Sequence, residues 1–261
     1  MFVLLIAGLL SAAAACRADD GGTFPFHVGE KLTYQIYWGP FIAGDATLEV
    51  REIEVVDGHD CYHLVARAQT SGFVDWMFHV NSTTESWLDV KELCTRRYRQ
   101  NRTEGKHTRR SETRYDYVHN QFTITNHITG ARQILPLHHP VQDIVSALYY
   151  SRSQPLSHEK PQNFLVNAGD TNHVVHIQTD LHKTVWVSPL GNVPAFRIEP
   201  KPTITVVAAN KGRMWVWISD NAQKIPLIMI STMKIGSVRF QLTEIHPPRT
   251  APAPATRISR D

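Results

Sequence analysis

The sequence predicts a mainly β protein: a large curved antiparallel sheet, half-barrel or sandwich-like, with one main amphipathic helix packed on it. Many short stretches alternate apolar with polar residues and are separated by turn-forming Gly, Asp and Asn. One stretch places its apolar residues at helical spacing instead. Strands and helices do not alternate along the chain, which argues against a parallel sheet. The 261 residues suit one larger all-β domain, or at most two small ones.

The first 15 residues are apolar, uncharged and rich in Ala, and they end at Cys16. Such a run is too short for a stable membrane anchor and is typical of a signal peptide. The small residues Ala13, Ala14 and Ala15 directly before Cys16 resemble a lipoprotein cleavage site, so we expect lipidation at Cys16. Simple cleavage, or retention of the segment as an anchor, are the alternatives. Residues 16–23 then form a polar tether, and the absence of Asp after Cys16 favours the outer membrane.

Strands are expected in the first half of the chain at 31–38, 43–56, 61–70, 81–88, 92–101, 106–117, 121–126 and 131–135. Gly44 indicates a bulge and Asp57-Gly58 a hairpin turn. Residues 71–80 carry a compact apolar cluster after Gly72. We expect this cluster to close one end of the sheet, and a membrane-facing loop is the alternative.

A helix is predicted over 141–151, because five apolar residues share one stripe: Val141, Ile144, Val145, Leu148 and Tyr149. Pro140 stands where a helix prefers its first residue, and Asp143 lies in the first turn, where the helix dipole favours an acid. We expect this helix to pack into the concave side of the sheet.

Strands resume at 162–167, 173–179, 184–187 and 193–199, and we expect Pro200 and Pro202 to interrupt them. Residues 213–230 then form two strands around a polar turn at 219–224, followed by a strand at 235–244. Both faces of the strand at 214–218 are apolar, so core covers one face and protein, lipid or a ligand covers the other. The candidate ligand-facing residues are Trp215, Trp217, Leu148 and Tyr149. Residues 24–246 form a single domain, and the Pro/Ala-rich 247–261 form a disordered tail.

After Cys16 only two cysteines remain, Cys61 and Cys94. Each opens a predicted strand, with one further strand between them. In a simple meander they would lie about 9–10 Å apart, beyond the reach of a disulfide. We therefore expect two unpaired structural thiols, and a disulfide only if the strand order differs from the chain order.

Three segments carry a resemblance to a known family. They are FPFHVGEKLTY at 24–34, DIVSALYYSR at 143–152, and a C-terminal hairpin with WISD at 217–220, IPL at 225–227 and GSV at 236–238. In them the chain resembles the DUF3108 proteins, a bacterial envelope family of unknown function. It departs from the family pattern at Asn221, where a second acid is usual, and at Lys224, where Arg is usual. The resemblance implies a secreted or lipid-anchored, mostly antiparallel β domain, and supplies no catalytic residues.

Motifs for catalysis or metal binding are missing from the sequence. Its 14 histidines form no HExxH motif and no zinc-spaced set with Cys, so we expect no metal and no cofactor. It has no Gly-x-Ser-x-Gly elbow and no phosphate-cradling Gly loop. We therefore expect a protein that is not an enzyme, with a hydrolase as the least favoured alternative. The turn at Ser219, Asp220 and Asn221 is interpreted as turn chemistry, in which Asp and Asn side chains bond nearby backbone.

A basic hairpin is the remaining candidate site. Its arginines could contact an anionic partner, such as lipid head groups or another envelope component: Arg96, Arg97, Arg99, Arg102, Arg109, Arg110 and Arg114. An exposed, partly self-neutralised hairpin without a partner is the plainer interpretation. The net charge of +3 is too weak to indicate nucleic acid.

These observations predict an exported, non-enzymatic envelope lipoprotein in the periplasm, anchored to the outer membrane, with a structural or assembly role. The alternative is a periplasmic carrier that holds a lipid or acyl chain in the concave face of the sheet. Other envelope proteins, or an envelope lipid or lipoprotein, are the expected partners.

Overall fold

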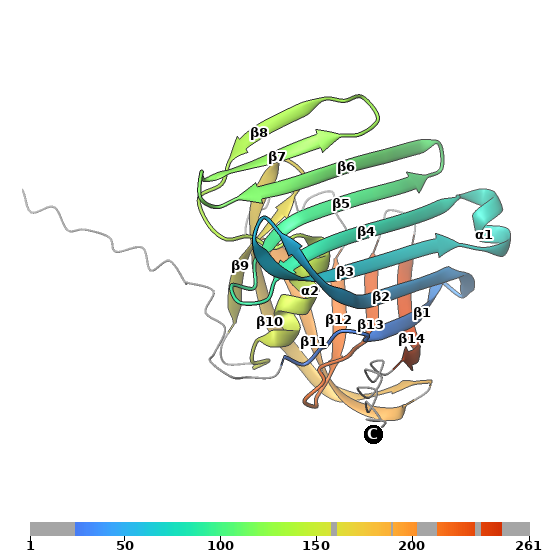
Figure 1. Cartoon of the computed structure of the whole chain (residues 1–261). Coiled ribbons are helices and arrows are strands. Elements are labelled where there is room, and N and C mark those ends of the chain that lie inside the picture. The colour runs from blue at the N-terminus through green and yellow to red at the C-terminus, as the bar shows by residue number, and fades with distance from the viewer. Residues whose placement is uncertain (1–23, 158–160, 189, 203–212, 233–235, 247–261) are drawn as a thin grey trace, which may run out of the picture.

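A computed structural model describes residues 24–157, 161–188, 190–202, 213–232 and 236–246. In these residues one 14-stranded sheet runs in the order β8-β7-β6-β5-β4-β3-β2-β1-β14-β13-β12-β11-β10-β9. Every neighbouring pair is antiparallel. The predicted mainly β fold, with a large curved antiparallel sheet, is confirmed (Figure 1). The predicted signal peptide, tether, Cys16 and tail lie outside the described residues.

The strands of the first half are β1 (Lys31–Trp38), β2 (Phe41–Val56), β3 (His59–Thr70), β4 (Val80–Asp89), β5 (Thr95–Glu104), β6 (His107–Asp116), β7 (Gln121–Asn126) and β8 (Arg132–Pro136). Those of the second half are β9 (Gln162–Ala168), β10 (Thr171–Val187), β11 (Gly191–Pro202), β12 (Met214–Ser219), β13 (Pro226–Thr232) and β14 (Ser237–His246). Two helices interrupt the series, α1 (Gly72–Met77) and α2 (Ile144–Ser153).

The strand order is a meander whose first and last strands, β1 and β14, pair with each other in the middle of the sheet. Its two edges, β8 and β9, are therefore neighbours in the sequence, joined by the segment that contains α2. The sheet bends strongly, and α2 lies inside the curve, as predicted (Figure 1). On one side α2 packs against residues of β2, β3 and β4, and on the other against residues of β10, β11 and β12.

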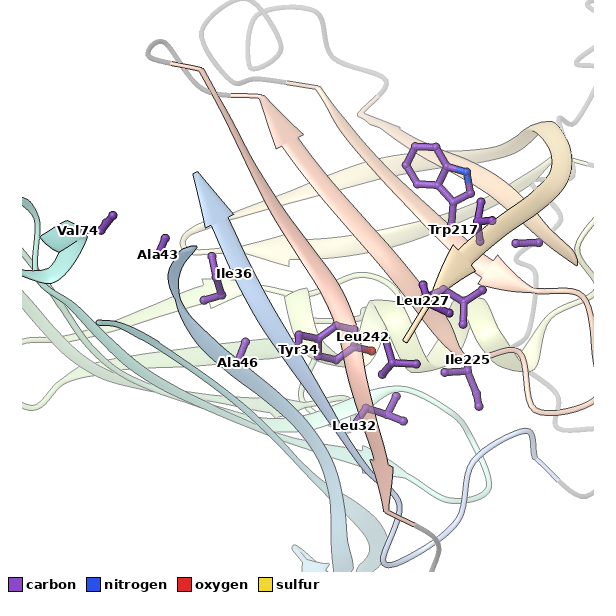
Figure 2. Packing of buried hydrophobic residues seen from close by; sticks show 13 residues of the cluster. Leu32, Tyr34, Ile36, Ala43, Ala46, Val74, Trp217, Ile225, Leu227 and Leu242 are labelled. Atoms are coloured by element: carbon purple, nitrogen blue, oxygen red, sulfur yellow. The ribbon is translucent and has the colours of Figure 1, made fainter. Parts of the chain in front are cut away.

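The main hydrophobic core starts from β1, whose alternate residues Leu32, Tyr34 and Ile36 are all buried. Figure 2 shows these three side chains with Ala46 of β2 and Leu242 of β14. Successive residues of a strand face opposite sides of its sheet, so one side of β1 forms the core beside α2. The Tyr34 hydroxyl donates a hydrogen bond to the Pro226 carbonyl at 2.8 Å, which ties β1 to the start of β13.

Gly44 produces the predicted bulge in β2. Ile36 pairs with Gly44 and Tyr37 with Ile42, so Ala43 is the extra residue. Gly44 has φ +155°, and a Cβ placed there would lie 1.9 Å from the Gln69 carbonyl oxygen. Glycine is needed because no side chain fits against β3 at this point.

Two expectations about strand ends are wrong. β10 is one continuous strand of 17 residues, with a register shift between Thr179 and Leu181 in place of the predicted break. β11 also continues through Pro200 and Pro202, which pair with Ile177 and Val175. Proline is tolerated there because β12 pairs with β11 only from Ala195 to Ile198, so this end of β11 has no described neighbour on its other side.

The expectation that the apolar cluster at 71–80 closes the sheet is also wrong. Only Val74 of α1 is buried, against Ala43 and the core. Phe73, Trp76 and Phe78 are exposed instead, Trp76 by 82%. A helix of six residues can bury one side only, and the adjacent apolar side chains are left in solvent.

Cys61 and Cys94 are buried and unpaired, as expected from a meander in which β4 separates β3 from β5. Burial raises the pKa of both thiols to about 12. Neither thiol ionises at neutral pH, which suits structural residues.

Among the described residues no helix is long and apolar enough to cross a membrane.

Candidate functional site

The candidate site is the concave face of the sheet, and α2 closes one end of it. Asp143 caps the N-terminus of α2 by accepting hydrogen bonds from the Val145 and Ser146 backbone N–H groups at 2.7 and 3.0 Å. The hydroxyls of Ser86 and Thr95 also donate to this carboxylate. Asp143 is fully buried, and burial raises the pKa of its carboxyl above the usual value despite these donors. One acid thus fixes the start of α2 onto β4 and β5.

The other end of α2 is fixed by Arg152, the largest fully buried side chain described. Its guanidinium donates to both carboxylate oxygens of Glu30, at 2.6 and 2.9 Å, and to the Pro25 and Gln223 carbonyls at 3.1 Å. Burial alone would lower the pKa of Arg152, but the Glu30 carboxylate raises it above its ordinary value. Arg152 therefore stays charged and joins α2 to two segments far apart in the chain.

Small side chains form the floor of the concave face beyond α2. Register places one row across the strands, in the order Leu242, Tyr34, Ala46, Ala68 and Ser82. A second row contains Leu48, Ala66 and Thr84. Directly paired residues share a face of the sheet, so the alanines and hydroxyl residues lie side by side.

A cavity of about 140 Å³ lies over this floor, between β2–β4 and the opposite wall formed by Met229 of β13 and Phe240 of β14. Leu48, Met229 and Phe240 are only partly buried, so apolar surface remains accessible inside the sheet. The cavity is lined by Tyr34, Ala46, Thr47, Leu48, Ala66, Arg67, Ala68, Ser82, Thr84, Met229 and Phe240.

A second hollow of about 140 Å³ lies against the same strands, mainly on the opposite face of the sheet. Six of its lining residues alternate with Ala46, Ala68 and Ser82 and so face away from the cavity: Asp45, Thr47, Arg67, Gln69, Asn81 and Thr83. It extends to Gln69 and Asn81, the residues on either side of the loop that contains α1. On the concave side, the floor follows β2–β4 from the core towards the end of the sheet where α1 lies, away from α2. We name this end the mouth.

Two arginines continue the first row at the mouth. Ser82 pairs with Arg102 of β5, and Arg102 pairs with Arg109 of β6. Both guanidinium groups act on Tyr98: burial raises the pKa of the Tyr98 hydroxyl, and Arg102 and Arg109 lower it. Arg102 lies 3.3 Å from Glu104, whereas the described residues offer Arg109 no ion pair. A partly uncompensated positive charge therefore borders the apolar floor.

The other predicted arginines lie elsewhere and have acidic partners. Arg97, Arg99 and Arg114 all contact Glu112, at 2.6, 3.2 and 2.8 Å. Arg96 is buried and bonds Asp89 and Glu92, both at 2.9 Å. Arg110 is exposed and has no ion pair among the described residues. The hairpin is thus partly self-neutralised, with Arg109 and Arg110 as its unpaired members.

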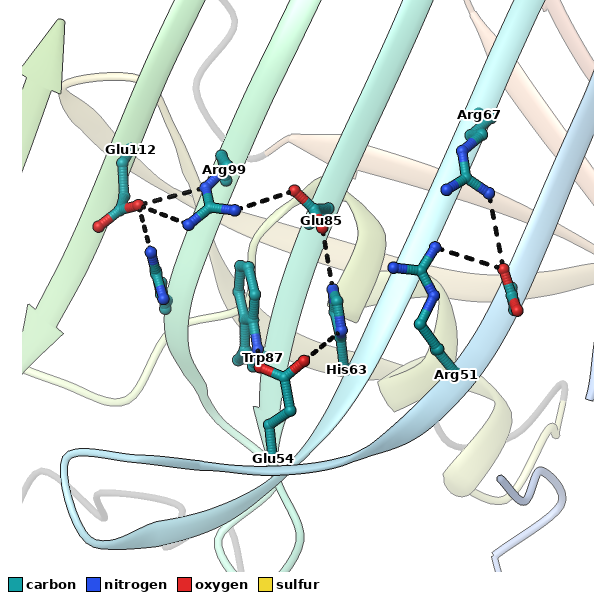
Figure 3. A network of polar contacts seen from close by, with 10 residues as sticks. Arg51, Glu54, His63, Arg67, Glu85, Trp87, Arg99 and Glu112 are labelled. Atoms are coloured by element: carbon teal, nitrogen blue, oxygen red, sulfur yellow. Dashed lines mark hydrogen bonds and ion pairs between the residues drawn. The ribbon is translucent and has the colours of Figure 1, made fainter. Parts of the chain in front are cut away.

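Figure 3 shows that the pair of Arg99 and Glu112 belongs to a ladder of ion pairs across neighbouring strands. Glu85 alternates with Thr84 along β4, so the ladder lies on the face of the sheet opposite to the cavity. Arg99 bridges Glu112 and Glu85, and Glu85 accepts from His63 Nε2 at 3.1 Å. Trp87 stacks on the His63 ring, with centroids 4.6 Å apart. The His63 bond lowers the pKa of Glu85. The ladder satisfies its own charges and leaves little for a ligand.

One part of this ladder brings together metal-ligand types that the sequence spacing did not indicate. Single ligand atoms of Glu52, Glu54 and His63 lie within 4.8 Å of one another. They meet because β2 has a register shift between Val50 and Glu52. Glu54 already accepts from Trp87 Nε1 at 2.8 Å and lies 2.8 Å from His63 Nδ1, so the structure explains the group as an ion-pair cluster.

The four predicted ligand-facing residues do not line the cavity. Tyr149 packs in the core between α2 and Phe26, and Leu148 contacts the cluster around Val216. Trp215 and Trp217 lie on the side of β12 opposite to Val216. Trp217 is buried with residues of the β10–β11 hairpin, well apart from Ala46 in Figure 2. The second apolar face of β12 is thus covered by protein.

The polar turn after β12 has the chemistry predicted for it. Asn221 Oδ1 accepts hydrogen bonds from Ser219 Oγ and from the backbone N–H groups of Gln223 and Lys224, at 2.9–3.1 Å. Asn221 therefore acts as a turn residue.

Sequence reasoning missed the cavity floor. The signal was available as small residues at alternate positions of consecutive predicted strands: Ala46, Ala66, Ala68, Ser82 and Thr84. Alternation assigns each set to one face, but only the register places the sets side by side. The large aromatic residues Trp215 and Trp217 are the stronger local signal in the sequence, and they lead the prediction of a ligand-facing surface to β12 instead.

Comparison with solved structures supports the fold. The chain is similar to a β-barrel-like protein of the DUF1849 domain family from Brucella abortus, with 10% identity, a TM-score of 0.55, and coverage of 85% of this chain and 99% of that one. It also matches a protein with a YmcC-like fold from Bacteroides fragilis, provisionally described as exported, over 86% of this chain and 98% of that one. That match has 9% identity and a TM-score of 0.32, so no argument rests on it.

No curated protein matches the chain significantly. The family model described as protein of unknown function DUF3108 matches residues 33–243, which include every strand of the sheet in whole or in part. The chain belongs to the DUF3108 family, whose function is unknown.

Proposed function

We propose that the protein is a non-enzymatic carrier that binds the acyl chain of an anionic amphiphile, such as a fatty acid or phospholipid, in the concave face of its sheet. The observation that carries this proposal is the cavity between the small-residue floor and the wall of Met229 and Phe240. Binding sites for small molecules are concave and mostly apolar, with a few polar groups that fix orientation.

The size of the cavity suits a narrow ligand. An apolar cavity of roughly 150 Å³ accepts a molecule the size of benzene. The cavity of about 140 Å³ would hold a segment of one acyl chain, and the concave face continues from it towards the mouth. α2 blocks the opposite end, so the chain would enter from the mouth.

The polar end of such a ligand would meet Arg102 and Arg109. Both lie on the row of residues that contains Ala68 and Ser82. A guanidinium pairs with a carboxylate or a phosphate through two parallel hydrogen bonds. The predicted ligand therefore carries a negative charge at the end of its apolar chain.

Filling the floor tests the proposal. In the Ala68→Phe and Ala66→Phe variants, a ring would occupy the cavity, and we expect uptake of the anionic probe 11-dansylaminoundecanoic acid to fall at least about tenfold. Ala131→Phe, in the exposed β7–β8 turn, is the matched control and should bind as the wild type does. Folded wild-type protein that takes up no probe, or floor variants that bind normally, would overturn the proposal.

Replacing the two arginines at the mouth provides a second test of the proposal. Arg102→Gln with Arg109→Gln should weaken binding of the acid probe and leave binding of its uncharged methyl ester nearly unchanged. Equal loss for both probes would show that the arginines do not recognise the charge.

We also propose that the carrier acts in the bacterial envelope as a lipoprotein attached at Cys16, on the periplasmic side of the outer membrane. The support is the apolar run of 15 residues and the small residues Ala13, Ala14 and Ala15 before Cys16. Labelling of cells with an alkyne palmitate should mark the wild type and not a Cys16→Ala variant. A structural or assembly role through the arginine hairpin has less support, because five of its seven arginines already have acidic partners.

A further inference from the structure

Large apolar side chains gather at the mouth, in the loop of α1 and in the turn between β1 and β2. Six are exposed by 46–82%: Phe41, Ile42, Phe73, Trp76, Met77 and Phe78. The two segments adjoin, because the Ser71 N–H donates to the Ala43 carbonyl at 2.9 Å and Val74 packs in the same cluster as Ala43. Contiguous apolar surface of this kind on a soluble domain marks a site of interaction.

Four of these six side chains are aromatic. The Phe73 and Trp76 rings lie 5.9 Å apart, and Trp76 is the most exposed of the six. Trp and Phe are the side chains that insert at the boundary between lipid head groups and acyl chains.

Basic residues lie beside the apolar surface in the β5–β6 hairpin, Lys106 in its turn and Arg110 in β6. The Gly105 N–H donates to the His79 carbonyl at 2.7 Å, and the Phe78 ring packs against Gly105. Lys106 and Arg110 are exposed in this hairpin and form no ion pair with any described residue.

Asp45 of β2 is an exposed acid at this end of the sheet, whereas two other nearby acids are already engaged. Asp75 of α1 accepts from Thr70 and contacts His79 at 2.8 Å, and Glu104 pairs with Arg102. The β5–β6 hairpin therefore presents net positive charge next to the apolar side chains. Apolar insertion combined with cationic contacts is how proteins attach to anionic bilayers.

We propose that the β1–β2 turn, α1 and the β5–β6 turn form a docking surface for bilayers of anionic phospholipid. These three segments lie at the mouth, so docking would set the open end of the concave face against the membrane. The docking surface would thus let an acyl chain pass between bilayer and cavity without crossing water. This inference goes beyond acyl-chain binding, and its test does not depend on an occupied cavity.

Vesicle sedimentation of the full chain tests the surface, with vesicles of phosphatidylglycerol and phosphatidylcholine compared with phosphatidylcholine alone. We expect Phe73→Ser with Trp76→Ser, and separately Lys106→Glu with Arg110→Glu, to lower the partition onto anionic vesicles at least about tenfold. The matched controls are Trp186→Ser and Lys183→Glu, which are exposed on the β10–β11 hairpin and should bind as the wild type does. All proteins carry the same N-terminal segment, so their differences report the folded surface.

Hydrogen exchange on the same samples locates the contact. Anionic vesicles should slow exchange in residues 71–79 and 104–110 and leave 181–187 unchanged. Exchange that is unaffected at the mouth, or partition unchanged in both double variants, would overturn the proposal. The Ala68→Phe variant should still dock, so failure of acyl-chain binding and failure of docking are distinguishable.

Discussion

At the scale of single residues, the buried pair of Arg152 and Glu30 joins three parts of the chain that are far apart. Removing one partner leaves an uncompensated charge in the core, which typically costs about 3–5 kcal/mol. We expect Arg152→Met or Glu30→Gln to lower the free energy of unfolding in urea by that amount. The double variant should recover part of the loss, because no unpaired charge remains.

Arg197→Met serves as the control, since Arg197 pairs with Asp180 in a position about one-third exposed. It should cost at most about 1 kcal/mol. Single variants at Arg152 and Glu30 that stay within this range would contradict the role of the pair.

Glu112 makes the ladder sensitive to acid. Burial alone would raise the pKa of the Glu112 carboxyl. Hydrogen bonds from Arg97 and Arg114 have the larger combined effect and lower this pKa to about 2. A carboxyl whose pKa is lower in the folded state adds stability above its unfolded pKa of about 4.5, and this stability is lost as pH falls through about 2.

We therefore expect Glu112→Gln to lower the free energy of unfolding by about 1–2 kcal/mol at pH 7. This loss is smaller than the full pKa shift of Glu112 would imply, because the ladder borders solvent. The difference from the wild type in denaturant titrations should shrink as pH falls from about 5 towards 2. A difference that stays constant over this range would assign the loss to packing. Glu104→Gln, in an exposed pair with Arg102, is the control and should change little.

Single residues could be assigned from sequence where their role is local. Asn221 is correctly predicted in a turn, and Asp143 near the start of the helix, because capping and turn chemistry act over a few residues. The predicted start at Val141 is wrong, since α2 begins at Ile144 and Asp143 is its N-cap, outside the first turn. The partner of Arg152 could not be found, since Glu30 lies 122 residues away. The cavity floor was missed for the same reason.

At the scale of elements, Gly44 tests how closely β2 and β3 approach. Any side chain there would meet the Gln69 carbonyl and the Thr70 Cα. We expect Gly44→Ala to lower the free energy of unfolding by about 2–4 kcal/mol, from strain and clash together. Gly58→Ala is a control with open space around it, where φ +84° brings backbone strain alone. Equal losses in thermal unfolding would show that the close approach of β3 does not matter.

Most strands, and α2, could be predicted because period-2 and period-3.6 patterns are local signals. β10 was divided in error, because its bulge at Thr179 disturbs the alternation without ending the strand. The exposure of α1 could not be predicted, since an apolar cluster has the same composition whether it is buried or presented to a partner.

At the scale of the whole molecule, the curved sheet leaves one end filled and the other open. Sequence could predict a curved antiparallel sheet with a helix in its concavity. It could not predict that β1 pairs with β14, because that contact joins the two ends of the domain. This pairing brings Met229 and Phe240 opposite the alanines of β2 and β3, and so creates the cavity.

Native mass spectrometry of the purified protein tests the proposal of an acyl-chain carrier most directly. The wild type, released from detergent, should retain a fraction bound to one fatty acid or phospholipid, and organic extraction should recover that lipid. The Ala68→Phe variant should be detected without bound lipid, while the Ala131→Phe variant should retain the lipid. A wild type that is folded and free of lipid, and that stays free after incubation with excess fatty acid, would contradict the account.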